Sequence, residues 1–119
     1  MVLQPSVKVD ASGNSSVSKY TGVQGTLDYN VCRKVEGIVN VSGRIHTMGN
    51  NTPAQGIFFQ IPEGFRPSFD IYTIGSMNVV GTGFVPLLAH IRPDGLVEMI
   101  YSQSNKTDQV AFSATYKVV

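Results

Sequence analysis

Tryptophan is absent from this sequence, and cysteine occurs only once, as Cys32. A lone cysteine cannot form a disulfide within the chain, and no spaced cysteine or histidine pair suggests a zinc site. We therefore expect Cys32 to be a small, partly buried side chain on a strand. No cofactor is expected.

Charged residues are also scarce. They make up 14% of the chain, whereas about a quarter is usual. The net charge is +1, so neither a nucleic-acid partner nor an acidic tail is indicated. A surface so poor in charge is typical of proteins that cover it with other subunits. The composition therefore favours an oligomer.

The sequence also lacks the usual signals of membrane insertion and of catalysis. No apolar run reaches the length needed to span a membrane, and the start of the chain shows no signal-peptide pattern, so no membrane insertion is expected. Nucleophile elbows, P-loops and HExxH motifs are missing. Asp94 and Glu98 could lie at the separation that glycosidases use, but nothing else supports catalysis. We predict that the protein is not an enzyme.

Helical periodicity is missing as well, and alternation takes its place. Apolar residues recur at every second position, and the segments between them are rich in glycine and proline. This pattern predicts an all-β domain, a compact antiparallel β-barrel or jelly-roll-like sandwich of about seven short strands. The expected strands lie at 27–35, 39–46, 57–61, 69–74, 84–92, 96–101 and 110–118.

In the expected strand at 27–35, the alternation predicts which side chains face the core. Its apolar residues are predicted to face the core, opposite a polar set. The apolar set is Leu27, Tyr29, Val31 and Val35, and the polar set is Asp28, Asn30 and Lys34.

The chain length fits one domain with a modest core. A polar cluster fills residues 12–16. We interpret residues 1–19 as a lead-in or tether and residues 20–119 as the domain. A start with so little apolar periodicity suggests a piece of a longer protein.

The segment 57–67 is predicted to form a corner between strands. Its apolar run ends at Pro62, which cannot donate a ladder hydrogen bond, and Gly64 permits a sharp turn. Phe65 is expected to fold back onto the sheet, with Arg66 reaching outward.

The tripeptide Pro-Asp-Gly at 93–95 predicts a three-residue hairpin with a bulge at Gly95. A two-residue turn would mix polar and apolar side chains on each face, so we favour the bulged register. That register pairs Arg92 with Leu96, Ile91 with Val97, His90 with Glu98 and Ala89 with Met99. Its apolar face comprises Leu87, Ala89, Ile91, Val97 and Met99.

The other face of this hairpin is the candidate binding site. It gathers His90, Arg92 and Glu98, with Asp94 at the tip. Such donors and acceptors suit sugar hydroxyls or a phosphate. Tyr101 could stack on a sugar ring, although this register places it on the core side. The alternative is a solvated face with a cross-strand ion pair that contributes less than about 1 kcal/mol.

Several segments, taken in order, resemble a known family. They are Gly-Arg-Ile at 43–45, Ile-Phe-Phe-Gln-Ile-Pro-Glu-Gly-Phe-Arg-Pro at 57–67, Ile-Arg-Pro-Asp-Gly-Leu-Val at 91–97 and Phe-Ser-Ala-Thr-Tyr at 112–116. The order resembles the head domain of receptor-binding proteins from lactococcal siphophages, the adhesins of the phage baseplate and tail tip. The resemblance covers residues 20–119.

This resemblance implies a homotrimer of β-barrels at the virion's tail tip, facing the host and binding its cell-wall saccharide. The lead-in would come from a preceding neck region, and the N-terminal part would contact other baseplate or tail proteins.

The family's sites lie near subunit boundaries and use a histidine, an acid and an aromatic residue. His90 matches the histidine. Arg92 stands two positions beyond it, so the acid would be Asp94 or Glu98. Without tryptophan, the stacking residue would be a tyrosine such as Tyr101.

Three hypotheses follow for the function. The first is a trimeric saccharide-binding adhesin. The second is a structural trimer that caps or stiffens a virion fibre without binding a ligand. The third is a cell-wall hydrolase, which the missing catalytic motifs disfavour.

Overall fold

The computed structural model describes residues 12–49, 52–101 and 106–118, and these form ten β-strands and no helix. The all-β prediction is confirmed, with ten strands in place of about seven. No helix in these ranges is long and apolar enough to cross a membrane. The strands are β1 (Ser12–Ser16), β2 (Ser18–Lys19), β3 (Thr26–Tyr29), β4 (Val31–Val35), β5 (Ile38–His46), β6 (Gly56–Gln60), β7 (Ile71–Val79), β8 (Gly83–Ile91), β9 (Leu96–Ile100) and β10 (Thr107–Lys117).

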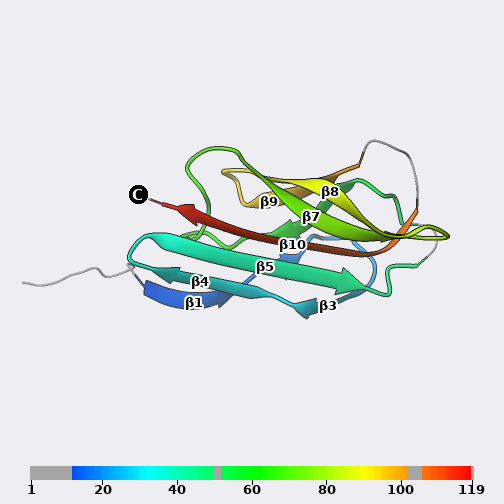
Figure 1. The fold of residues 1–119 in the computed structure, drawn as a ribbon. Helices are drawn as coiled ribbons and strands as arrows, with labels where there is room; N and C mark the ends of the chain where they lie inside the picture. The colour runs from blue at the N-terminus through cyan, green and yellow to red at the C-terminus, as the bar shows by residue number, and fades with distance from the viewer. Residues whose placement is uncertain (1–11, 50–51, 102–105, 119) are drawn as a thin grey trace, which may run out of the picture.

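The strands form one antiparallel sheet in the order β1-β4-β5-β10-β7-β8-β9-β6-β2, and β3 also pairs with β5. The edge strands β1 and β2 are separated in the chain only by Val17, which is 1% exposed. The backbone N–H of Val17 donates to the Asn30 carbonyl, and the N–H of Tyr20 donates to the Phe58 carbonyl. The two edges of the sheet therefore meet here, and the sheet is nearly closed into a barrel (Figure 1).

Residues 12–19, within the expected lead-in, contribute β1 and β2 to this sheet. The first eleven residues of the lead-in lie outside the described residues.

The core lies between the two halves of the curled sheet. It is built from side chains at alternate positions of the long strands, with Phe59 and Phe112 packed ring against ring at 4.8 Å. Cys32 belongs to this core, and its burial raises the pKa of its thiol to about 11. The fully buried side chains of greatest volume are Phe59, Ile45, Met48, Ile61, Met77, Ile91 and Met99.

The assignment of faces in the first expected strand is wrong beyond Leu27. The segment forms two strands, and the register of β3 against β5 shifts between Leu27 and Tyr29. The shift reverses which side chains face inward, because side-chain direction alternates residue by residue. Val31 and Val35 are exposed, and Lys34 is buried.

Buried Lys34 has partners that compensate its charge. Its Nζ donates to the Gly64 carbonyl at 2.7 Å and lies 5.3 Å from the centre of the Phe65 ring. The amine therefore joins β4 to the corner at 57–67.

That corner follows β6 and leads to β7. Phe65 packs against the core as predicted, and the Tyr116 hydroxyl donates to its carbonyl. The expected outward direction of Arg66 is wrong. Its Nε turns back and donates to the Ile61 carbonyl at 2.8 Å, which closes the corner on itself.

Candidate functional site

The predicted hairpin forms with the predicted register, and this register places the candidate site. His90 lies opposite Glu98, and Ile91 lies opposite Val97. Gly95 has φ 89° and donates its N–H to the Arg92 carbonyl, as the bulged turn requires. All five residues of the predicted apolar face are buried.

Three neighbouring strands bring a cluster together around His90. On β8, Ala89 and Ile91 point into the core, so His90 points outward. The pairings of β7 with β8 and of β8 with β9 place Tyr72, His90 and Glu98 side by side across the sheet. Asp70, immediately before β7, completes what we call the His90 cluster: Asp70, Tyr72, His90 and Glu98.

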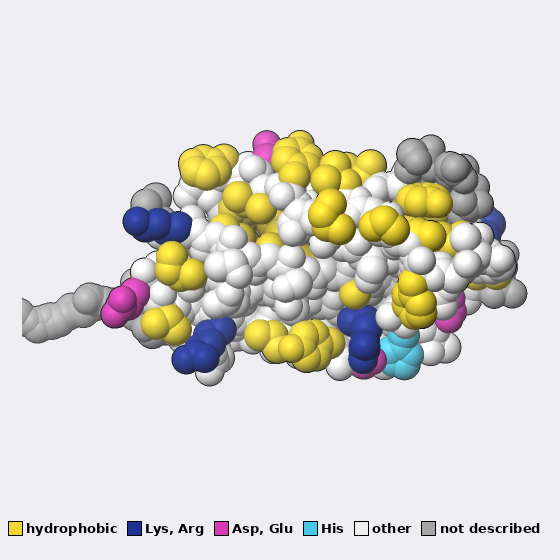
Figure 2. All heavy atoms as spheres, viewed as in Figure 1, with side chains coloured by type: hydrophobic (Ala, Val, Ile, Leu, Met, Phe, Trp, Pro, Cys, Tyr) yellow, Lys and Arg dark blue, Asp and Glu magenta, His cyan; other side chains and the backbone are white. Residues whose placement is uncertain are grey.

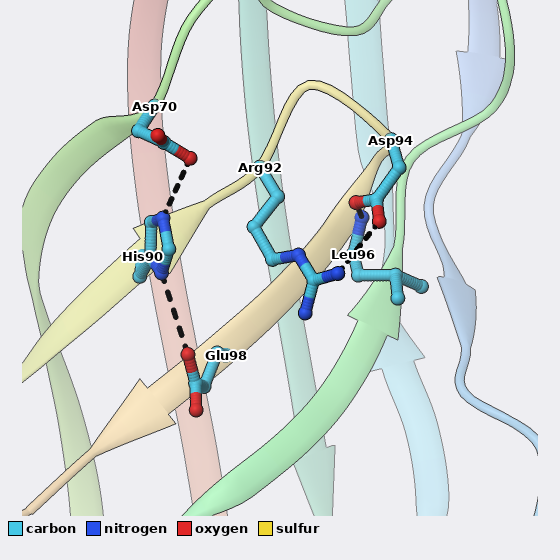
Figure 3. Close-up of polar contacts among 6 residues, drawn as sticks. All are labelled: Asp70, His90, Arg92, Asp94, Leu96 and Glu98. Atoms are coloured by element: carbon cyan, nitrogen blue, oxygen red, sulfur yellow. Dashed lines mark hydrogen bonds and ion pairs between the residues drawn. The ribbon is translucent and has the colours of Figure 1, made fainter.

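The geometry of the His90 cluster is close. The Nε2 of His90 lies 2.8 Å from Oδ1 of Asp70, and its Nδ1 lies 3.3 Å from Oε1 of Glu98 (Figure 3). The Tyr72 ring stacks on the imidazole with centroids 4.5 Å apart and planes 10° apart. The His90 side chain is only 16% exposed, whereas Asp70 is 55% exposed. The cluster therefore presents carboxylate oxygens and an aromatic ring to solvent around a fixed histidine.

Arg92 and Asp94 form a second polar pair at the tip of the hairpin. Nη2 of Arg92 donates to Oδ2 of Asp94 at 2.8 Å, and the N–H of Leu96 donates to Oδ1 at 3.1 Å. The backbone hydrogen bond from Leu96 is the main cause that holds the pKa of Asp94 below its usual value, and Arg92 adds to it. Arg92 thus turns toward Asp94, beside the His90 cluster (Figure 3).

The structure places Tyr101 away from this surface. Its side chain is partly buried and packs against the core, on the side that the hairpin register predicts. Of the five predicted residues, His90 and Glu98 are in direct contact, Arg92 and Asp94 pair with each other, and Tyr101 lies apart.

Asp70 and Tyr72 were missed as site residues. The glycines at 81 and 83 mark a turn between β7 and β8, and counting back from it would have placed Tyr72 opposite His90. Asp70 carries no such signal, because the loop before β7 sets its position.

A second charged group lies on β3 and β5. Arg44 donates from Nε and Nη2 to the two carboxylate oxygens of Asp28, at 3.0 and 2.8 Å, and His46 Nε2 lies 3.3 Å from Oδ2. The hydrogen bond from Arg44 is the main cause that lowers the pKa of Asp28. Within the described ranges, no group of three or more His, Cys, Asp or Glu side chains is placed to hold a metal ion.

Apolar side chains are exposed beside the His90 cluster, on the outer face of β7 and β8. Ile74 lies directly opposite Leu88, and Phe84 lies further along β8. Their exposed fractions are 69%, 37% and 67%. Figure 2 shows apolar side chains gathered along the edge of the molecule over these strands. We call Ile74, Phe84 and Leu88 the apolar strip.

Comparison with known proteins bears on the fold. No family model and no curated protein matches the chain. Among solved structures, the head domain of phage bIL170 matches with a TM-score of 0.62 and 14% identity, over 91% of this chain and 99% of that one. It was described in a study asking whether the receptor-binding domains of lactococcal phages share a common fold. This chain has the fold of that head domain. The predicted resemblance is therefore confirmed as a likeness of fold.

Proposed function

We propose that this chain is the receptor-binding head of a phage tail protein and binds a saccharide of the host cell wall. The observation that carries the proposal is the fold match, which spans almost the whole of both chains. Because that neighbour is a receptor-binding domain, the match supports a non-enzymatic binding role. A fold alone does not define a ligand, so the saccharide is argued from the site.

The His90 cluster has the chemistry that a sugar needs. Carboxylates of Asp70 and Glu98 can accept hydrogen bonds from hydroxyl groups. Tyr72 is 58% exposed and offers a flat apolar surface beside them. The two carboxylates and the stacked ring already fix His90, so the site is formed before a ligand arrives. Arg92 and Asp94 add donors and acceptors at the neighbouring tip.

Association of copies belongs to the same proposal. A homotrimer would cover Phe84 and Leu88 of the apolar strip, and the low charge content of the chain favours such burial. Three weak sites on one particle would raise the apparent affinity for a cell surface through avidity. The proposed location is the tail tip of a virion, facing the host, with other tail or baseplate proteins attached through the N-terminal part.

Replacement of His90 tests the site. We expect His90→Ala to lower the affinity for lactococcal cell-wall polysaccharide by about tenfold or more, because the side chain that both carboxylates contact is lost. His46→Ala is the matched control, since His46 also faces a carboxylate but lies on β5. Binding is measured by biolayer interferometry, after thermal melting has shown that both variants are folded.

The alternatives give different results. Equal binding by His90→Ala and the parent would remove the His90 cluster from the proposal. A parent trimer that binds no envelope material would favour the structural fibre cap. Release of reducing sugar would favour a hydrolase.

A further inference from the structure

A groove of about 530 Å³ lies on the outer face of the sheet, where β10 passes between β5 and β7. Its walls include Tyr29 and Arg44 on one side and Ile74 on the other. Its lining also includes three serines, Ser42 on β5, Ser76 on β7 and Ser113 on β10. Neither the hairpin nor the His90 cluster accounts for this groove.

The groove exists because two strands part. β10 pairs with β5 over residues 110–117, but with β7 only as far as Ala111 opposite Ser76. Gly75 stands at the point of separation. A Cβ there would lie 2.7 Å from the Ala111 carbonyl oxygen, so no side chain can fill this position without moving the strands.

An added β-strand is a poor occupant. The Thr73 hydroxyl donates to the Ser113 carbonyl at 3.2 Å. The Ser113 carbonyl is therefore already used, although an inserted strand would need it as a hydrogen-bond acceptor. The same hydrogen bond holds β7 and β10 so close together that a single threonine side chain spans the gap between them. A purely apolar partner would remove the serine hydroxyls of the lining from water and offer them no hydrogen bond in return.

A saccharide fits the lining better. The Tyr29 ring is 52% exposed and Ile74 is 69% exposed, so both offer apolar surface to a sugar ring. Ser42 already donates to Ser113 at 3.1 Å, and these hydroxyls can exchange partners with sugar hydroxyls. The paired contact with Asp28 holds Arg44 in place as a further donor.

The groove and the His90 cluster share one strand. Tyr72, Ile74 and Ser76 are successive outward-facing residues of β7, the first in the His90 cluster and the other two in the groove. A strand rises about 3.3 Å per residue, so Tyr72 and Ser76 are separated by about 13 Å. That span exceeds a single sugar ring and suits a short chain of sugars.

We propose that the groove between β5, β10 and β7 binds further units of the saccharide chain that contacts the His90 cluster. This inference rests on the proposed function and extends it from a single sugar to an oligosaccharide.

The test measures affinity against ligand length. The probes are size-fractionated fragments of cell-wall polysaccharide from lactococcal strains, and binding is measured by calorimetry. For the parent, we expect affinity to rise about tenfold or more from the shortest fragment that binds to longer ones. Ser113→Tyr fills the groove and should remove that rise while leaving the shortest fragment bound.

Thr115→Tyr is the matched control. Thr115 is the next outward residue of β10 and also contacts a polar side chain of β5, but it does not line the groove. It should behave like the parent. Tyr29→Ala removes an exposed aromatic ring from the groove wall and leaves the groove open. It should also abolish the rise in affinity with fragment length.

The outcomes separate the two proposals. If short fragments bind in a His90-dependent manner and Ser113→Tyr keeps the parent's length dependence, the groove inference is overturned and the proposed function stands. If the parent binds no fragment of any length, both are overturned.

Discussion

At the scale of the residue, Gly95 has the most exacting position in the hairpin. Its φ of 89° lies in the left-handed region, and a Cβ would collide with the Ile61 carbonyl oxygen and with Arg66. The Ile61 N–H also donates to the Gly95 carbonyl at 2.7 Å. One glycine thus sets the hairpin register and joins the hairpin to the corner at 57–67.

Replacement of this glycine should be costly. We expect Gly95→Ala to lower the free energy of unfolding by about 2–4 kcal/mol, because strain at positive φ adds to a clash with backbone. Gly81→Ala is the control, since Gly81 has φ 85° with nothing within 4 Å of an added Cβ. It should cost about 1 kcal/mol. If urea denaturation gives Gly95→Ala and Gly81→Ala the same loss in the free energy of unfolding, the contact between Gly95 and the corner does not stabilise the fold.

At the scale of the element, β4 shows how a polar side chain can occupy a core position. Lys34 is 7% exposed, and its hydrogen bond to Gly64 compensates the buried charge. The bond connects a strand near one edge of the sheet to the loop between β6 and β7.

Removal of the Lys34 amine should loosen that connection. Methionine has an unbranched side chain of similar length but no amine. We expect Lys34→Met to lower the free energy of unfolding by about 1–3 kcal/mol, because a hydrogen bond from a charged group is lost. Arg33→Met on the exposed side of β4 should stay within about 0.5 kcal/mol of the parent. If thermal and urea unfolding give the two variants equal stability, the Lys34 contact does not support the fold.

The elements also show what the sequence can predict. The hairpin register was predictable because Pro-Asp-Gly fixes a turn, and a turn fixes which residues face each other. The prediction from alternation was wrong at 27–35, because a shift in register between Leu27 and Tyr29 reversed which side chains face the core. No residue in this segment signals that shift. The contact between Asp70 and His90 could not be predicted in this way. The ten-residue loop between β6 and β7 positions Asp70, and the course of that loop depends on the packing of the whole barrel.

At the scale of the whole molecule, the apolar strip bears on assembly. Phe84 and Leu88 of this strip are both exposed on the outer face of β8. Contiguous exposed apolar surface commonly marks a site of contact between proteins.

Introducing charge on this strip tests whether copies associate through it. We expect the parent to sediment as a trimer and Leu88→Lys with Phe84→Lys to sediment as a monomer, because a buried lysine without a partner opposes the contact. Val31→Lys, at another exposed apolar side chain on β4, should leave the trimer intact. A parent that remains monomeric at high concentration would contradict the proposed assembly.

The most direct test of the central claim is the binding of the parent protein to purified cell-wall polysaccharides from a panel of lactococcal strains, measured by biolayer interferometry. We predict binding to the polysaccharide of some strains and not of others, with competition by the free polysaccharide and loss in His90→Ala. Absence of binding to every polysaccharide in the panel, by a folded protein at high concentration, would contradict the account.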